Sequence, residues 1–443
     1  MQEIVPFRAL VYNQDRVGEI SEVVTPPYDV ISGEQQKAFY GRHPHNVIRL
    51  DKSLAKEGED GVLDSQDAAA CLAEWMAGEV LSLDPEPALY LASVEFPHKG
   101  KNLTRLGLFA RVRLASYEQG VILRHEKTFS KTKTERLKLM KACGANFSPI
   151  FSLYPDETGV HEDLARVAET EKPFIDHADD VGHRHRVWRM AAPGFCRDIC
   201  SRLAGETLFI ADGHHRYETA LKYRDELRES QGIGPDHPAN FVMMYLASVR
   251  DPGLAILPTH RLVKGMDPGR LEALVSEAPQ FFEVDRVSLS GPDPDAAKLG
   301  FISRLSPNGR PESLRRIGLV LSGQDQALVL SVKTGTMKRL FGDEMPQALR
   351  QLDVSVLTRL IFGHILGSTP GEMVREKRLS YTSSHEEAFG AVARGDAQAA
   401  FFLNPATNEQ VCQVAAQGLT MPQKTTYYYP KVITGHVMNL LTV

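Results

Sequence analysis

The chain has 443 residues, too many for one ordinary hydrophobic core, so its length predicts two to four domains. Hydrophobic residues make up 42% and charged residues 24% of the chain, a composition typical of soluble enzymes that excludes disordered and fibrous proteins. The net charge of −5 argues against a protein whose main task is to neutralise nucleic-acid phosphates, so no nucleic-acid partner is expected.

The first residues contain no basic segment followed by an apolar core, and no apolar run is long enough to span a bilayer. We therefore expect neither a secretory signal nor a membrane partner. The five cysteines are scattered and odd in number, which fits a reducing cytoplasm. Cys196 and Cys200 could share a helix face, but two ligands do not make a zinc site.

The order of strand and helix patterns predicts a multidomain protein of mixed α+β and α/β class. We expect four regions: an N-terminal α+β region at 1–118, a core at 119–265 with an insert at about 155–206, a small α+β module at 266–345, and a C-terminal α+β region at 346–443. In the last region, a helix pattern covers residues 354–366.

The first cluster of charged residues follows a short predicted strand at 120–123. It contains Arg124, His125 and Glu126, and a tight cluster after an apolar strand is a common place for chemistry. The alternative for Glu126 is an ion pair with Lys127, Arg124 or a basic residue of the next helix. That helix is predicted at 132–143 and a strand at 146–154.

Within the insert, His183-Arg184-His185-Arg186 alternates as a strand does. Two histidines at this spacing could reach one metal ion. Because no third ligand is evident, we interpret the segment as a solvated strand.

An apolar run at 207–211 then breaks into Asp212-Gly213-His214-His215-Arg216, ahead of a helix at 217–228. Gly213 lets the backbone bend or approach a ligand closely, and the start of the helix leaves N–H groups unpaired. With two imidazoles and a guanidinium added, the expected ligand is a phosphate group. The alternative is that Asp212 only caps the helix and the histidines lie on a wet surface.

Together the two clusters contain what phosphoryl transfer requires: positive charge around the moving group, a carboxylate for the acceptor hydroxyl, and a carboxylate oxygen for magnesium. Arg216 and the histidines supply the first, Glu126 the second, and Asp212 is the candidate Mg²⁺ ligand. Neither a Walker-type phosphate loop nor the protein-kinase motifs are present.

Two segments further along the chain carry additional candidates. A strand pattern at 255–263 places His260 beside an arginine, and Lys424 lies next to a proline turn near the end of the chain.

The glycine turn and the histidine-glutamate segment resemble those of a known superfamily. The glycine turn is similar to the phosphate-binding strand, turn and helix of the ParB/sulfiredoxin superfamily, and Val121-Ile122-Leu123-Arg124-His125-Glu126 resembles the histidine-glutamate segment of its free-serine kinases. Over nearly its full length the chain also resembles a bacterial and archaeal family catalogued as domain-of-unknown-function family 1015. The segments that carry this resemblance are Pro26-Pro27-Tyr28-Asp29-Val30-Ile31, Leu257-Pro258-Thr259-His260-Arg261-Leu262 and Lys424-Thr425-Thr426-Tyr427-Tyr428-Tyr429-Pro430-Lys431.

The resemblance implies a ParB/sulfiredoxin-like nucleotide-binding core flanked by α+β modules. It implies that Glu126 is the base for a serine hydroxyl, that Asp212 assists at the metal or the acceptor, and that the phosphates of ATP or ADP bind to Gly213, His214, His215 and Arg216. We further expect the substrate to be contacted, or its contacts to be supported, by His125, Arg136, Asn146, His260 and Lys424.

Two features of the superfamily are missing. Sulfiredoxins have a catalytic cysteine where this chain has His214, so sulfinic-acid repair is not expected, and no helix-turn-helix DNA reader follows the core. The leading hypothesis is a cytoplasmic, Mg²⁺- and nucleotide-dependent kinase for a small hydroxylated metabolite, with free L-serine favoured. The alternatives are a non-catalytic nucleotide-binding switch and a metal-dependent phosphohydrolase. A homodimer is compatible with each of them.

Overall fold

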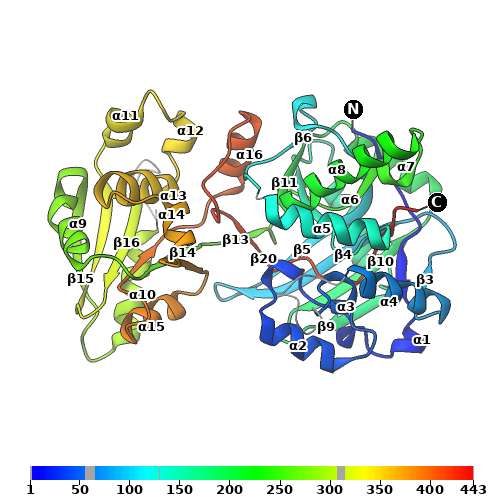
Figure 1. Ribbon diagram of the computed structural model, residues 1–443, viewed down its shortest axis with the longest axis horizontal. Helices are drawn as coiled ribbons and strands as arrows, with labels where there is room; N and C mark the ends of the chain where they lie inside the picture. Colours follow the sequence, from blue (N-terminus) through cyan, green and yellow to red (C-terminus); the bar gives the residue numbers. More distant parts are fainter. Residues whose placement is uncertain (1, 55–64, 129, 307–314, 443) are drawn as a thin grey trace. The chain divides into compact units, whose positions relative to one another are not determined.

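The computed structural model describes residues 2–54, 65–128, 130–306 and 315–442. It divides the chain into two compact units, unit 1 with Met1–Ala255 and Pro430–Val443, and unit 2 with Ile256–Tyr429. In sequence, unit 2 is therefore inserted between two parts of unit 1 (Figure 1). The last of the four expected regions contributes to both units, and the four-region division itself stays a prediction.

Unit 1 is built on a mixed sheet that has nine strands among the described residues. Two neighbouring pairs, β6 with β11 and β8 with β12, are parallel, and the other pairs along the sheet are antiparallel. The order is β6 (Ile122–Leu123), β11 (Leu208–Asp212), β8 (Ile150–Tyr154), β12 (Phe241–Ser248), β5 (Lys101–Arg113), β4 (Leu89–His98), β10 (Arg184–Met190) and β9 (Ile175–Ala178), with β1 (Ile4–Val5) also on β5.

The middle of this sheet is buried on both faces. All residues of β12 are buried, as its continuous apolar sequence predicts for a central strand. Gly107 on β5 lies under the ring of Tyr245, and a Cβ at this position would be 2.0 Å from the ring's Cζ. Any residue with a side chain at position 107 would collide with the Tyr245 ring, so this position of β5 requires glycine.

Helices surround the sheet of unit 1 (Figure 1). One face packs against apolar residues of α6, α7 and α8, with α5 beside α8. The bounds of the helices are α1 (Gln14–Val17), α2 (Gly33–Arg42), α3 (Ile48–Asp51), α4 (Ser65–Ala77), α5 (Ser130–Cys143), α6 (Val160–Thr170), α7 (Pro193–Leu203) and α8 (His214–Gln231).

The C-terminal segment, residues 430–443, returns to unit 1 after unit 2 has been completed. Thr434 and Thr25 exchange backbone hydrogen bonds of 2.8 and 3.2 Å. Further on, β21 (Asn439–Leu440) pairs with β7 (Ala145–Asn146), just before β8. The segment therefore lies beside elements that are far from it in the sequence.

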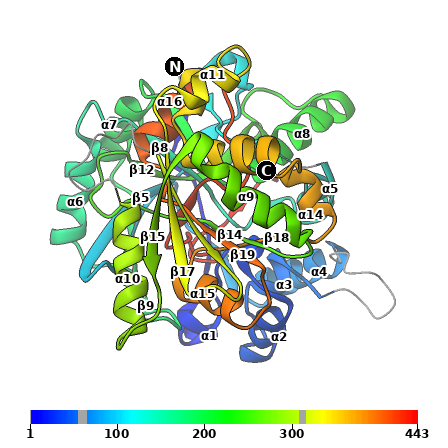
Figure 2. The ribbon, with the colours of Figure 1, turned by 90° about the vertical axis from the view of Figure 1, so that its left-hand side faces the viewer.

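The described residues of unit 2 form a six-stranded antiparallel sheet with helices on both faces (Figure 2). Its order is β15 (Phe282–Ser288), β17 (Gln326–Val332), β16 (Arg316–Leu321), β19 (Ala399–Phe402), β14 (His260–Val263) and β18 (Leu379–Thr382). One face packs on α9 (Pro268–Phe281) and α16 (Asn408–Ala416), and the other on α10 (Pro294–Leu305) and α15 (His385–Ala393).

The helix predicted at 354–366 is present, although most of it is the π-helix η5 (Val356–Ile365), which follows the short α13 (Asp353–Ser355). Sequence periodicity cannot distinguish these forms because tertiary packing of an apolar helix selects between them. In the described part of the chain, no helix is both long enough and apolar enough to cross a membrane. The expected multidomain mixed α/β class is confirmed, and the ParB/sulfiredoxin-like identity of the core stays a prediction.

Candidate functional site

The strand, turn and helix predicted around Gly213 are present as β11 and α8. Gly213 separates them with a φ of 93°, a left-handed conformation that glycine adopts without a steric penalty. As the N-cap of α8 it offers no side chain to the helix's first N–H groups, and the first turn of α8 contains no acidic residue. The start of α8 therefore carries an uncompensated partial positive charge.

Asp212, the last residue of β11, lies between two cations. Its Oδ2 accepts a hydrogen bond of 2.7 Å from Arg216, and its Oδ1 accepts one of 2.6 Å from Lys431. Burial alone would raise the pKa of Asp212, but Lys431 and Arg216 lower it well below its usual range. The carboxylate is therefore ionised, and the three side chains together carry a net positive charge.

This arrangement decides how well Asp212 fits its predicted role as a magnesium ligand. Mg²⁺ needs carboxylate oxygens that are free to complete an octahedral shell. Both oxygens of Asp212 already accept charge-assisted hydrogen bonds, so Asp212 fits that role poorly in this arrangement. Its contacts fit better with a residue that orients Arg216 and Lys431.

Arg216 folds back over the turn from the first turn of α8. Besides Asp212, its guanidinium donates to the carbonyl oxygen of Pro149, just ahead of β8. A Cβ at Gly213 would come 3.0 Å from Cζ of Arg216. The glycine therefore provides both the turn and the space that the guanidinium occupies.

The segment that carries His125 and Glu126 lies directly beside this turn. Because β6 pairs in parallel with β11, with Ile122 opposite Leu208, both chains leave the sheet at the same edge. His125 donates from Nδ1 to the carbonyl oxygen of Ile210 at 2.9 Å, and its ring meets that of His214 edge to face at 4.7 Å between centroids. Glu126 is the next residue, so its backbone is one peptide unit from this contact.

Both histidines at this contact are buried and uncharged. Burial lowers the pKa of His125 to about 4 and that of His214 well below its usual value. His214 is only 4% exposed, and within the described part of the chain its Nε2 has no hydrogen-bond partner. A buried polar atom without a partner is costly, and a bound ligand is one way to satisfy it.

Glu218, one turn further along α8, holds the segment after β6 in place. It accepts hydrogen bonds of 2.7 Å from Arg124, 2.5 Å from Thr128 and 2.8 Å from Lys133. Arg124, which the sequence offered as an ion-pair partner of Glu126, therefore pairs with Glu218. These bonds fix the residues on both sides of Glu126 to the helix that begins at Gly213.

Arg136 and Asn146 make contacts that hold secondary structure elements together. Arg136 on α5 donates to the carboxylate of Asp51 at 2.5 Å and to its carbonyl oxygen at 2.7 Å. Asn146 accepts from Asn439 at 3.0 Å and from the backbone of Met243 at 3.3 Å. That either residue also contacts the substrate stays a prediction.

Asp51 is a residue of this site that sequence reasoning missed. It is 2% exposed and accepts a hydrogen bond of 2.6 Å from Ser148, whose hydroxyl is 2.8 Å from that of Thr434. Asp51, Arg136, Ser148 and Arg216 line a cavity of about 30 Å³, which has room for about one water molecule. No local motif marks Asp51, because its partners come from distant parts of the chain.

The structure places His260 and Lys424 in unit 2, in a different unit from the turn. His260 accepts at Nδ1 from the backbone of Leu403 and packs against the rings of His385 and Phe402. The lysine found at Asp212 is Lys431, from the same Lys424–Lys431 segment that carried the resemblance. The sequence signal was present, but it did not indicate which of the two lysines lies at the turn.

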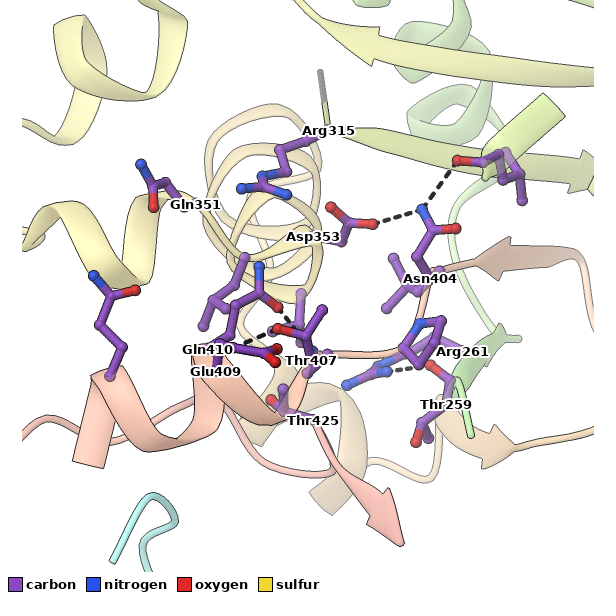
Figure 3. Close-up of a pocket in the computed structure, with 17 residues that line it drawn as sticks. Thr259, Arg261, Arg315, Gln351, Asp353, Asn404, Thr407, Glu409, Gln410 and Thr425 are labelled. Carbon is purple, nitrogen blue, oxygen red and sulfur yellow. Dashed lines mark hydrogen bonds between the residues drawn. The ribbon is translucent and has the colours of Figure 1, made fainter. Parts of the chain in front are cut away.

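Unit 2 has a polar cavity of its own, with a volume of about 360 Å³ (Figure 3). Arg261, 2% exposed, donates to the carbonyl oxygens of Thr259 and Lys424. Asp353, whose pKa is raised by burial, accepts from Asn404 at 2.9 Å. The lining therefore combines a buried cation with a carboxyl group. This combination suits a small polar ligand that carries both positive and negative groups.

Fold and site together define a two-unit mixed α/β protein in which a basic strand–glycine–helix turn lies beside a histidine-glutamate segment. The chain belongs to the DUF1015 family, described as a protein of unknown function, whose model matches residues 4–355. The family expected from the sequence is thereby confirmed.

Comparison with solved structures finds distant similarity. A free serine kinase variant in complex with AMP has 14% identity and a TM-score of 0.35, covering 73% of this chain and 87% of that one. A conserved hypothetical protein from Pyrococcus furiosus has 14% identity and a TM-score of 0.34, covering 74% and 92%. C-terminally truncated SbnI from Staphylococcus aureus has 11% identity and a TM-score of 0.33, covering 74% and 85%. No curated protein matches the chain.

Proposed function

We propose that this protein is a nucleotide-dependent phosphotransferase that phosphorylates a small hydroxylated metabolite, with free L-serine as the favoured acceptor. The observation that carries the proposal is the parallel pairing of β6 with β11, which places the His125-Glu126 segment beside the basic turn at Gly213. A turn of this kind suits phosphate binding alone, and the added carboxylate suits transfer.

The roles follow from the contacts. The N–H groups at the start of α8, together with the cations Arg216 and Lys431, would hold the phosphates and stabilise the charge of the transition state. His214, with its buried Nε2, would donate or accept a hydrogen bond to the bound nucleotide. His215, the second residue of α8, would join them at the phosphates.

In the transfer step, Glu126 would take the proton from the serine hydroxyl while the hydroxyl oxygen attacks the terminal phosphorus of ATP or ADP. The bond from that phosphorus to the bridging oxygen breaks, and ADP or AMP leaves with O-phosphoserine as the other product. Mg²⁺ would enter bound to the nucleotide as part of the substrate, and Asp212 would keep its bonds to Arg216 and Lys431 during the transfer.

The test is to incubate the purified chain with L-serine, Mg²⁺ and either ATP or ADP, and to measure O-phosphoserine by mass spectrometry. Glu126→Gln should lower the rate by about 10²–10⁴-fold while nucleotide affinity is retained, because the base acts in the chemical step. Glu118→Gln, an exposed glutamate eight residues earlier, is the matched control and should leave the rate unchanged.

Absence of product with both donors would reject serine phosphorylation. If nucleotide then bound and raised the melting temperature without any turnover, the non-catalytic switch would become the better explanation.

A further inference from the structure

Four histidines and an aspartate gather at one end of the unit 1 sheet, around the hairpin of β9 and β10. They are His177, His183, His185, His436 and Asp179. The interpretation of His183 and His185 as a solvated strand is wrong, because they are 4% and 3% exposed. In β10 the histidine face points into the protein and the arginines alternate outward, a choice that period-two alternation alone does not decide.

Asp179 supplies the third ligand that the sequence did not show. Its Oδ2 is 3.1 Å from Nδ1 of His183 and 3.1 Å from Nε2 of His185. The three ligand atoms all lie within 4.8 Å of one another. Ligand atoms around tetrahedral Zn²⁺, with bonds of about 2.0–2.2 Å, are separated by roughly 3.3–3.6 Å. One ion can therefore be accommodated with small movements of the side chains.

The hairpin turn holds Asp179 in the orientation that such a site needs. Its other oxygen, Oδ1, accepts from the backbone N–H of Val181 at 3.1 Å and of His183 at 2.9 Å. These two bonds fix the carboxylate and leave Oδ2 facing the imidazoles. Supporting bonds of this kind are what orient metal ligands in proteins.

A second pair of imidazoles adjoins these three residues. Nε2 of His177 is 2.8 Å from Nε2 of His436, and both rings pack on His185, at 5.3 and 5.6 Å between centroids. His436 belongs to the C-terminal segment, and His177 to β9.

We infer that this cluster is a binding site for a divalent transition-metal ion, with Zn²⁺ as the best match. Asp179, His183 and His185 are the ligands, and the His177–His436 pair packs beside them. Mixed imidazole and carboxylate ligands in a tetrahedral arrangement are typical of zinc. His436 of the C-terminal segment, which also carries Lys431, packs against the ring of the ligand His185. Neither the proposed kinase reaction nor its residues are needed for this site.

The experiment uses the full chain without a histidine tag, freed of metal by chelation and dialysis. Zn²⁺ alone is titrated by calorimetry, and Co²⁺ is titrated with visible absorption as the readout, since tetrahedral cobalt has an intense d–d band. We expect one ion per chain, the tetrahedral cobalt band, and a higher melting temperature with Zn²⁺.

Two substitutions test the ligands. Asp179→Asn keeps an oxygen for the backbone N–H groups of Val181 and His183 but removes the charge, and it should weaken Zn²⁺ binding by at least about 10-fold. His185→Gln should do the same, while His98→Gln, at the end of neighbouring β4, is the matched control and should bind normally. Circular dichroism of each metal-free variant checks that the chain is folded.

Two results would overturn the inference. The first is that the metal-free chain binds neither Zn²⁺ nor Co²⁺, which would make the cluster a hydrogen-bonded network only. The second is that both ions bind but the Asp179 and His185 variants bind them as tightly as the wild type.

Discussion

Lys431 and Asp212 are 219 positions apart in the sequence, yet Nζ of the lysine is 2.6 Å from Oδ1 of the aspartate. This ion pair places the C-terminal segment at the turn where the nucleotide phosphates are proposed to bind. It also makes Lys431, rather than a residue next to Gly213 in the sequence, the second cation of that turn.

Replacement of Lys431 by methionine should weaken both the fold and the turn. It removes one of the two cations on a largely buried carboxylate, but Arg216 remains bonded to Asp212, so we expect a loss of about 1–3 kcal/mol in the free energy of unfolding. Nucleotide affinity, measured by calorimetry, should fall about 10-fold because one phosphate cation is lost. The control is Lys37→Met, an exposed lysine of α2. If Lys431→Met and Lys37→Met were equally stable to urea, the ion pair of Lys431 with Asp212 would not contribute to stability.

Acidification should destabilise unit 1 through His125 and His214. The folded-state pKa of His125 is lowered to about 4, whereas the unfolded residue binds a proton below about 6.5. The unfolded state therefore gains protons first as the pH falls. The stability that comes from keeping His125 neutral is complete above about pH 6.5 and is lost as the pH falls toward 4. This loss amounts to about 2–4 kcal/mol in the free energy of unfolding.

The measurement is urea unfolding as a function of pH for the wild type and His125→Gln, which keeps a donor for the carbonyl oxygen of Ile210. The variant should show a shallower loss of stability between pH 6.5 and 4. His364→Gln, an exposed histidine of unit 2, should follow the wild-type curve. Parallel curves for wild type and His125→Gln would show that His125 does not contribute.

Glu218 should act as a positioning residue for Glu126. Glu218→Gln weakens three hydrogen bonds that hold Arg124, Thr128 and Lys133, so the segment after β6 gains freedom next to the turn. We expect kcat for phosphoryl transfer to fall about 10-fold with little change in nucleotide affinity, because misplacing a catalytic group slows the chemical step. Glu226→Gln, which removes a carboxylate two turns further along α8, is the matched control. If nucleotide affinity falls and kcat does not, Glu218 supports binding instead.

Asp51→Asn should strongly reduce the stability of the fold, although Asp51 lies far from the turn in the sequence. The substitution leaves the buried guanidinium of Arg136 without its carboxylate, and breaking a buried pair in this way costs about 3–5 kcal/mol. Thermal unfolding followed by circular dichroism measures the effect. An exposed aspartate such as Asp15 on α1, changed to asparagine, should shift the midpoint far less. A midpoint for Asp51→Asn close to that of the control would show that Arg136 finds another partner.

The strand, turn and helix of the site could be predicted from the sequence, whereas the elements that lie beside them in space could not. The apolar run ending at Asp212 and the glycine after it correctly predicted a strand, a turn and a helix, because each of these signals is local. The pairing of Ile122 with Leu208 joins segments that are far apart in the chain, and no periodicity within either segment reports it. The proposed mechanism depends on that pairing, because it brings the Glu126 segment beside the turn.

The same limit explains the remaining differences. The alternation of histidine and arginine at 183–186 correctly predicts a strand. It does not show that the histidines are buried, because the same alternation results whichever face of the strand points into the protein. Lys431 is the lysine bonded to Asp212, and no local signal distinguishes it from Lys424 in the same polar, tyrosine-rich segment. The ion pair of Arg136 with Asp51 depends on tertiary packing alone.

The two-part composition of unit 1 has a consequence for how the protein is made. A ribosome synthesises residues 256–429 before it reaches 430–443, so unit 2 can begin to fold while unit 1 still lacks its final segment. During that interval Asp212 has Arg216 but not Lys431, and Asp179 has its neighbouring histidines but not His436. A nascent chain that ends before residue 431 therefore lacks the second cation at Asp212, and one that ends before residue 436 also lacks the C-terminal member of the histidine cluster.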